Sequence, residues 1–408
     1  MTLWVDPPGA VALATRLRGM AAEVDESLSR AGAWEVMAAA AAVGLQRAIT
    51  QADGVGAVQA ARCVAEVETA VLQVVARVHA LRGELLALAG AFVRAARVLG
   101  AVEDGVADAL ARLDTLAHDH PDTVEWLAAR GHEHALGPLL AAGERGGLLV
   151  EGPHQFVGID TGPPRDVTAP KGLADLVADD IAVEEGDGFV RITEVTRPDG
   201  THAWVVAISG TKVLDPRAGS NPFDVTTDVR SIEAGATIAA IGVHRAVLAA
   251  QRSTGRETSA EPILLSGHSL GGMLAAGLAA DPAFRHGRNV TGVVTAGSPI
   301  GRMPVPASVG VVALEHRGDF VPRLDGVAGR TDDTWHTLTT DPDVQETGGR
   351  ASRSHAGELY EGSARAFDMV AREGELEWEE VIAPFVEPGA TAVAHDIVLT
   401  REWQNPRS

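Results

Sequence analysis

Apolar residues recur along this chain with two different periods, which divide it into two regions. Over residues 64–92 they alternate spacings of three and four, which predicts a long helix packed lengthwise on another helix. From about residue 148, short apolar runs of strand length alternate with helical segments. The pattern therefore predicts an all-α domain, residues 1–145, followed by an α/β domain, residues 148–408.

The first 145 residues are expected to form a helical hairpin or small bundle with no catalytic constellation. The apolar seam of residues 64–92 can be covered within this domain or by a helix of a partner protein, and the sequence leaves both open. Residues 141–147, which contain three glycines, are the expected linker to the second domain.

The α/β domain is expected to hold a mostly parallel, doubly wound sheet. Residues 189–196 alternate apolar and polar, and a Pro-Asp-Gly turn returns the chain as a second strand over 202–208. The segments 263–265, 290–295 and 309–314 are almost entirely apolar, as in central parallel strands that helices cover on both faces. One helix is predicted over residues 231–251.

Composition and charge narrow the function classes. The 34 basic and 55 acidic residues give a net charge of −21, which argues against a nucleic-acid partner because phosphate binding needs a basic surface. No signal peptide and no apolar run long enough to span a bilayer are visible, so we expect a soluble protein, either cytoplasmic or exported without a cleaved signal. A local apolar patch could still make transient contact with a lipid surface. The single cysteine, Cys63, excludes an intrachain disulfide.

The candidate nucleophile is Ser269, in the sequence Gly267-His268-Ser269-Leu270-Gly271. A short apolar run precedes this pentapeptide and a helical segment follows it, which is the strand–turn–helix context of a nucleophile elbow. The alternative is a tight turn that only needs small residues. Near the start of the following helix, free backbone N–H groups would favour developing negative charge.

Four histidines gather in a short window near the expected linker: His118, His120, His132 and His134. Such a cluster can bind zinc, but neighbouring proline and glycine residues favour the simpler interpretation of polar loops and helix ends. Ester hydrolysis by a serine nucleophile requires no metal and no organic cofactor, and we expect none.

Four segments, in order, resemble the lipase class 3 branch of the α/β-hydrolases. They are residues 204–211, which end in Ser-Gly-Thr, the nucleophile motif at 267–272, Thr-Ala-Gly-Ser-Pro at 295–299, and Asp319-Phe-Val-Pro-Arg-Leu at 319–324. The resemblance covers about residues 190–365 and implies an α/β-hydrolase fold, a lipid or other ester as substrate, and a Ser-Asp-His order of catalytic residues. The family usually has Arg at the position of Ser209.

Acyl transfer requires a base for the serine and a carboxylate for that base. Asp319 is the predicted carboxylate, with Asp325 as its rival. His355 is the predicted base, with His336 and His395 as the other candidates. Two groups are predicted to form the oxyanion hole, the backbone N–H of Leu270 and, by the resemblance, Thr211. Residues 212–227 form either a lid over the site or an ordinary surface loop.

The N-terminal domain loosely resembles the WXG-type helical domains of actinobacterial type VII secretion substrates. The likeness rests on helix length, alanine content and Trp34, although Glu35 and Val36 follow this tryptophan where the signature has a glycine. An ordinary helical accessory domain is the alternative. The sequence thus predicts a lipase, phospholipase or esterase, with a catalytically silent scaffold or secretion-associated binding protein and an acyltransferase as the rival functions.

Overall fold

The computed structural model describes residues 149–151 and 155–403, except 216, 233–236, 258–259, 328, 343 and 372–375, together with a few single residues before them. These residues, apart from Gly19 and Ala22, belong to the second of two units into which the chain divides, residues 114–408. The predictions for the helical domain 1–145, the seam of 64–92, Trp34, Cys63 and the histidine cluster lie outside the described residues.

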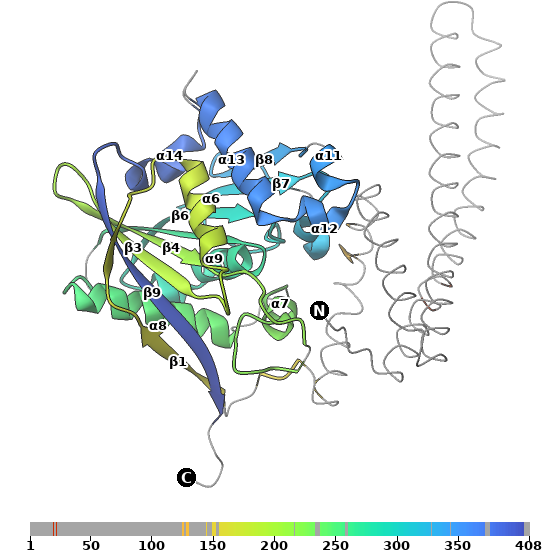
Figure 1. The fold of residues 1–408 in the computed structure, drawn as a ribbon, viewed down its shortest axis with the longest axis horizontal. Helices are drawn as coiled ribbons and strands as arrows, with labels where there is room; N and C mark the ends of the chain where they lie inside the picture. The colour runs from red at the N-terminus through yellow and green to blue at the C-terminus, as the bar shows by residue number, and fades with distance from the viewer. Residues whose placement is uncertain are drawn as a thin grey trace, which may run out of the picture. The chain divides into compact units, whose positions relative to one another are not determined.

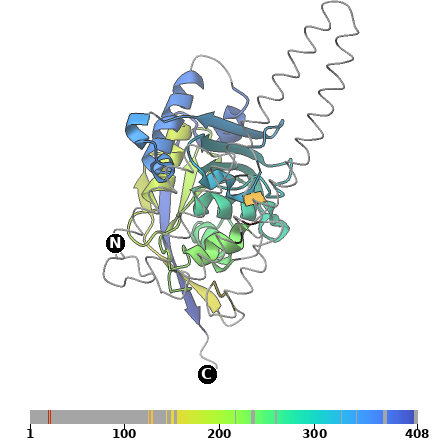
Figure 2. The same ribbon diagram turned by 90° about the vertical axis from the view of Figure 1, so that its right-hand side faces the viewer.

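The described chain is an α/β domain built on a mixed, mostly parallel sheet of nine strands (Figures 1 and 2). The strand order is β1-β9-β3-β4-β5-β6-β7-β8, and β2 pairs with β9. Strands β4 to β8 run parallel to one another, whereas β1, β2 and β3 pair antiparallel with β9. The strands are β1 Gln155–Thr161, β2 Arg165–Val167, β3 Val190–Thr196, β4 His202–Ile208, β5 Pro262–His268, β6 Asn289–Ala296, β7 Gly310–His316, β8 Trp335–Thr340 and β9 Thr391–Trp403.

Helices cover both faces of this sheet (Figure 1). On one face α8 and α9 pack on the strands, and on the other α6, α13 and α14 do so. The helical segments are α6 Leu173–Ala182, α7 Val225–Ile232, α8 Ile238–Ser253, α9 Leu270–Ala280, α10 Pro282–Arg285, η1 Val321–Asp325, α11 Val344–Thr347, α12 Ala351–Ser354, α13 Gly357–Ala371, α14 Glu379–Ile382 and η2 Ala383–Phe385.

Two apolar cores, one on each face, explain why the central strands are apolar at nearly every position. Val206 and Leu265 face the core under α8 and α9, whereas their chain neighbours Val205 and Leu264 face the core under α6. Neighbouring residues of a strand point to opposite faces, so burial of both faces removes the alternation of apolar and polar residues. The hairpin of β3 and β4 and the parallel pairing of β5, β6 and β7 confirm the predicted strands.

The single helix predicted over residues 231–251 is wrong. Helix α7 ends at Ile232 and α8 begins at Ile238. Thr237 is the N-cap of α8 in an extended conformation, and its hydroxyl accepts a hydrogen bond from the Ala240 N–H at 3.1 Å. A threonine that caps a helix in this way separates two helices even where the apolar pattern continues across it.

None of the described helices is long and apolar enough to cross a bilayer.

Candidate active site

The turn between β5 and α9 places Ser269 at the carboxyl end of a central strand. Its backbone has φ 55° and ψ −120°, a conformation that few residues other than glycine adopt. The Ser269 N–H donates to the carbonyl oxygen of Ala296 at 2.9 Å, which fixes the corner to β6. A strained serine at the corner between a strand and a helix is what the pentapeptide predicts.

Glycines make this corner sterically feasible. A Cβ atom on Gly267 would lie 2.3 Å from the backbone carbon of Gly271, and one on Gly271 would lie 2.0 Å from the carbonyl oxygen of Ile208. Both distances are far below van der Waals contact, and both obstacles are backbone. The second contact also shows that the chain after β4, which leads to Thr211, passes directly beside the corner.

The structure brings Ser269, His355 and Asp319 together although they come from three distant segments. His355 Nε2 lies 3.0 Å from Ser269 Oγ, and His355 Nδ1 lies 2.7 Å from Asp319 Oδ2. A carboxylate only accepts, so Nδ1 carries the proton and Nε2 is left to accept one from the serine hydroxyl. This is the hydrogen-bond chain that nucleophilic acyl transfer requires.

Asp319 lies in the turn after β7 and is held on several sides. Its side chain is fully buried, and it also accepts hydrogen bonds from the Tyr360 hydroxyl at 2.7 Å and the Val321 N–H at 2.9 Å. Burial alone would raise the pKa of Asp319, but the charge and hydrogen bond of His355, with the Val321 and Tyr360 donors, lower it. The carboxyl group therefore stays ionised beside the imidazole.

His355 follows α12 and precedes α13, so it lies between two helices. Burial lowers the pKa of His355, but Asp319, together with Glu184 and Asp228, outweighs this and raises it above the ordinary value. Such a raised pKa suits a group that takes a proton from a hydroxyl and returns it to a leaving group.

A second histidine, His268, connects the serine corner to His355. Its Nε2 lies 2.9 Å from the carbonyl oxygen of His355, and its Nδ1 lies 2.9 Å from Glu184 Oε1. The carbonyl can only accept, so His268 Nε2 must carry a proton and donate it. Glu184 and His268 thus hold the backbone of His355 through its carbonyl oxygen.

Helix α6 supports β5 through two carboxylates. Asp180 accepts from the Ser266 hydroxyl at 2.7 Å, and Glu184, just beyond the end of the helix, contacts His268. The two carboxylates are four residues apart on the helix side, and their partners are two residues apart on the strand. These separations span nearly the same length, so each carboxylate lies opposite its own partner. Burial raises the pKa of Asp180 well above its ordinary value.

Thr211 follows β4 and donates its hydroxyl to Asp228 of α7, at 2.9 Å from Oδ1 and 3.0 Å from Oδ2. Burial is the main reason why the pKa of Asp228 rises to about 7, with a smaller contribution from Asp224. Leu270 is the first residue of α9, and the first N–H groups of a helix have no acceptor within it. Leu270 directly follows Ser269, and Gly210, the residue before Thr211, lies beside the corner, since a Cβ atom on it would be 3.2 Å from the His268 carbonyl oxygen.

The rival candidates lie elsewhere. Asp325, at the end of η1, accepts from the N–H groups of Val327 and Arg302. His336 is on β8 and His395 on β9, and neither is among the described hydrogen-bond partners of Ser269 or Asp319.

Hydrogen bonds and an ion pair hold residues 212–227, the expected lid or loop. They join the start of the segment to its later part, and that part to β9. The Phe223 carbonyl oxygen accepts from the N–H groups of Lys212 and Val213. Arg401 of β9 is fully buried and donates to Asp224 and to the Gly219 carbonyl oxygen. Within the described part of this segment, the ion pair fixes the end that leads into α7.

Sequence reasoning missed Glu184, His268, Asp228 and Tyr360 as partners of the predicted site residues. Tyr360 follows His355 by only five residues, and this short spacing was the available signal. Glu184 and Asp228 had none, since they lie 84 residues before His268 and 17 residues after Thr211.

Within the described residues, no group of three or more histidine, cysteine or acidic side chains is placed to hold a metal ion. No protein-family model, no curated protein and no solved structure matches the chain.

Proposed function

We propose that this protein is a serine hydrolase of carboxylic esters, with the α/β-hydrolase fold of the lipase class 3 branch that its motifs resemble. The observation that carries the proposal is the hydrogen-bond chain from Ser269 Oγ through His355 to the buried Asp319. Lipid esters, either acylglycerols or phospholipids, are the substrates that the resemblance implies.

The reaction follows from the protons that each group can hold. Ser269 Oγ attacks the carbonyl carbon of the ester while its proton passes to His355 Nε2, and Asp319 stabilises the resulting imidazolium. The tetrahedral oxyanion accepts hydrogen bonds from the Leu270 N–H and from Thr211. When the carbon–oxygen bond breaks, the alcohol leaves with the proton from His355, and water then hydrolyses the acyl-enzyme by the same two steps.

Labelling with a fluorophosphonate probe tests the nucleophile directly. Wild type should form a covalent adduct, Ser269→Ala should not, and Ser253→Ala, which removes the hydroxyl of a serine at the end of α8, should label like wild type. Hydrolysis of p-nitrophenyl esters by the same three proteins then tests turnover. A folded wild type that neither labels nor hydrolyses any ester would refute the proposal and favour a catalytically silent scaffold.

An acyltransferase would keep the same nucleophile but release the acyl group to an alcohol. Product analysis in the presence of competing alcohols separates this function from hydrolysis, since a transferase yields the new ester in preference to the free acid. Export by a type VII route remains a prediction that rests on residues 1–145, and secretion of the full chain compared with residues 148–408 would test it.

A further inference from the structure

Two histidines end the strands that lead to Ser269 and Asp319. His268 is the last residue of β5 and directly precedes Ser269, and His316 is the last residue of β7, three residues before Asp319. Both are buried, with exposed fractions of 6% and 0%. The carboxyl ends of parallel strands lie at one edge of a sheet, so the two histidines lie at the edge that holds the candidate site.

Both rings bind the backbone of the turn that carries His355. His316 Nδ1 lies 2.7 Å from the carbonyl oxygen of Ser354, and His268 Nε2 lies 2.9 Å from the carbonyl oxygen of His355. A carbonyl oxygen only accepts, so each of these nitrogens carries a proton and donates it. Two successive carbonyl groups of the turn are thus held by two different strands of the sheet.

The turn has little regular structure of its own. Helix α12, which ends at Ser354, has four residues, and α13 begins only at Gly357. A helix of one turn is not stable by itself, and the carbonyl groups at a helix end have no partner within that helix. Hydrogen bonds from outside the helix therefore set where His355 points.

The ring of His316 is fixed on several sides. It stacks on Tyr360, with ring centroids 3.8 Å apart and planes at 6°, and its Nε2 lies 2.9 Å from the Ser363 hydroxyl. Burial lowers the pKa of His316, so the ring is uncharged near neutral pH, with its proton on Nδ1 and Nε2 free to accept from Ser363. The same Tyr360 donates its hydroxyl to Asp319. His316 thus contacts both the turn of His355 and the side chain that holds the carboxylate.

The ring of His268 is fixed in a similar way. Its Nδ1 lies 2.9 Å from Glu184 Oε1, and its ring packs on the ring of His355, with centroids 4.6 Å apart and planes at 33°. The donor nitrogen of each histidine is therefore aimed at the turn by contacts on the rest of its ring.

We propose that His268 and His316 are positioning residues for His355, which bind the carbonyl oxygens of His355 and Ser354 and so tie the imidazole to the strands of Ser269 and Asp319. This inference rests on the proposed esterase function and adds two residues to it. Neither ring exchanges a proton with the substrate. Their effect is on the distance and angle at which His355 Nε2 meets Ser269 Oγ, 3.0 Å in the structure, where a misplacement of about 1 Å costs about 10²-fold in rate.

Asparagine and glutamine distinguish the two ring nitrogens. The amide nitrogen of asparagine is the same number of bonds from Cα as Nδ1, and that of glutamine the same number as Nε2. His268→Gln and His316→Asn therefore keep the donor that faces the turn, whereas His268→Asn and His316→Gln move it. We expect kcat for p-nitrophenyl butyrate to fall about 10²-fold where the donor is moved, with KM within about twofold, and less than about tenfold where it is kept.

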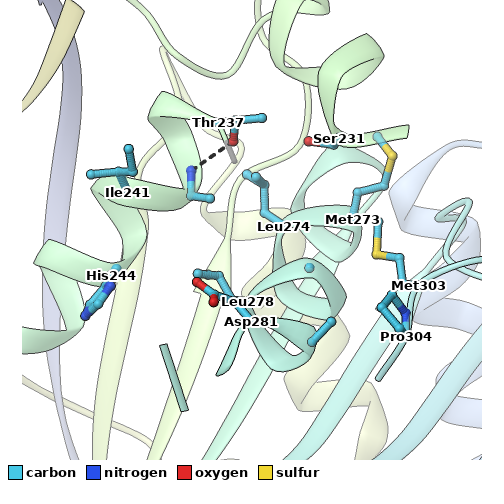
Figure 3. A pocket seen from close by; sticks show the side chains of 13 residues that line it. Ser231, Thr237, Ile241, His244, Met273, Leu274, Leu278, Asp281, Met303 and Pro304 are labelled. Carbon is cyan, nitrogen blue, oxygen red and sulfur yellow. Dashed lines mark hydrogen bonds between the residues drawn. The ribbon is translucent and has the colours of Figure 1, made fainter. Parts of the chain in front are cut away.

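His244 of α8 is the matched control. It is part-buried, packs edge-on against Phe284 with ring centroids 5.2 Å apart, and lines a cavity between α8 and α9 (Figure 3). The described residues that line this cavity include none of Ser269, His355 and Asp319. His244→Asn and His244→Gln should therefore both keep the kcat of wild type, with no difference between the two amides.

A proton NMR spectrum gives a second measurement that needs no turnover. The proton between His355 Nδ1 and Asp319 Oδ2, which are 2.7 Å apart, is in a charge-assisted hydrogen bond and should resonate far downfield. This resonance should persist where the donor is kept and should broaden or vanish where it is moved. Thermal unfolding midpoints identify any variant that does not fold, and the pair of substitutions at the other histidine then decides.

The outcomes separate this inference from the proposed function. If asparagine and glutamine at one of these histidines have equal effects on kcat and on the downfield resonance of folded protein, that histidine does not position His355, and the esterase function stands. If wild type neither hydrolyses the ester nor is labelled at Ser269 by a fluorophosphonate, the proposed function fails, and the resonance alone decides whether the two rings hold His355.

Discussion

The hydrogen bond between Thr211 and Asp228 predicts an unusual alkaline limit to activity. A threonine hydroxyl has a single proton, and here it is donated to the Asp228 carboxylate, whose two oxygens lie 2.9 Å and 3.0 Å away. While Asp228 is ionised, that proton is not free for an oxyanion. When Asp228 is protonated, it can donate to Thr211, and the threonine proton can turn to the substrate.

The magnitude follows from the pKa of Asp228, which burial raises to about 7. About half of the molecules then have a protonated Asp228 at pH 7, and this fraction falls tenfold with each further pH unit. We expect kcat to fall in the same way, until the N–H donors alone remain, with a total loss on the order of 10²-fold, the low end for one oxyanion donor.

The acid side of the profile has a different origin. The pKa of His355 lies above its ordinary value, and only the neutral imidazole can take the serine proton, so activity is lost as the pH falls through this raised pKa. The two limbs together give a bell-shaped dependence of activity on pH.

Tributyrin hydrolysis followed in a pH-stat would measure this profile for wild type, Asp228→Asn and Thr211→Val. The asparagine amide donates to Thr211 at every pH, so Asp228→Asn should lose the alkaline limb. Its acid limb should move to lower pH, because the charge of Asp228 contributes to the raised pKa of His355. Thr211→Val should be slow and flat above neutral pH, because no hydroxyl remains to be switched. The reasoning is refuted if Asp228→Asn keeps the alkaline limb of wild type.

Three further predictions test other parts of the site and fold. Asp319→Asn should lower kcat about 10⁴-fold with little change in the unfolding midpoint, as measured by single-turnover kinetics and thermal denaturation. Glu184→Gln removes a negative charge that raises the pKa of His355, so the acid limb of the pH profile should move to lower pH, and an unchanged limb would argue against this role. Arg401→Met leaves the buried Asp224 unpaired and should reduce the free energy of unfolding by roughly 3–5 kcal/mol in urea denaturation.

The sequence predicted those parts of the site that depend on local pattern. The apolar runs of β5, β6 and β7 and the glycines around Ser269 are local patterns that predict the local structure. The order of Ser269, Asp319 and His355 came from the family resemblance. The structure places all three within hydrogen-bonding distance. Their catalytic roles stay predictions.

The remaining contacts depend on tertiary packing that no short motif encodes. Glu184 meets His268 only because α6 crosses β5, and Asp228 meets Thr211 only because α7 follows a loop that Arg401 holds. The boundary between α7 and α8 was missed for a related reason. Apolar residues recur at helical spacing through residues 231–251. The helix boundary at Thr237 therefore does not interrupt the apolar pattern, and the sequence does not reveal it.

The position of β9 has a consequence for the order in which the domain can assemble. This strand is synthesised last of the nine, yet it lies between β1 and β3 and is bonded to both. On the ribosome, the strand that pairs with β1 in the described sheet is therefore missing until residues 391–403 emerge, and so is Arg401, the cation that the structure buries against Asp224. Pairing across so long a stretch of chain is slow, and it exposes unpaired strand edges in the meantime. Completion of the sheet is thus a late event in folding, and premature termination within the last strand would leave an aggregation-prone chain.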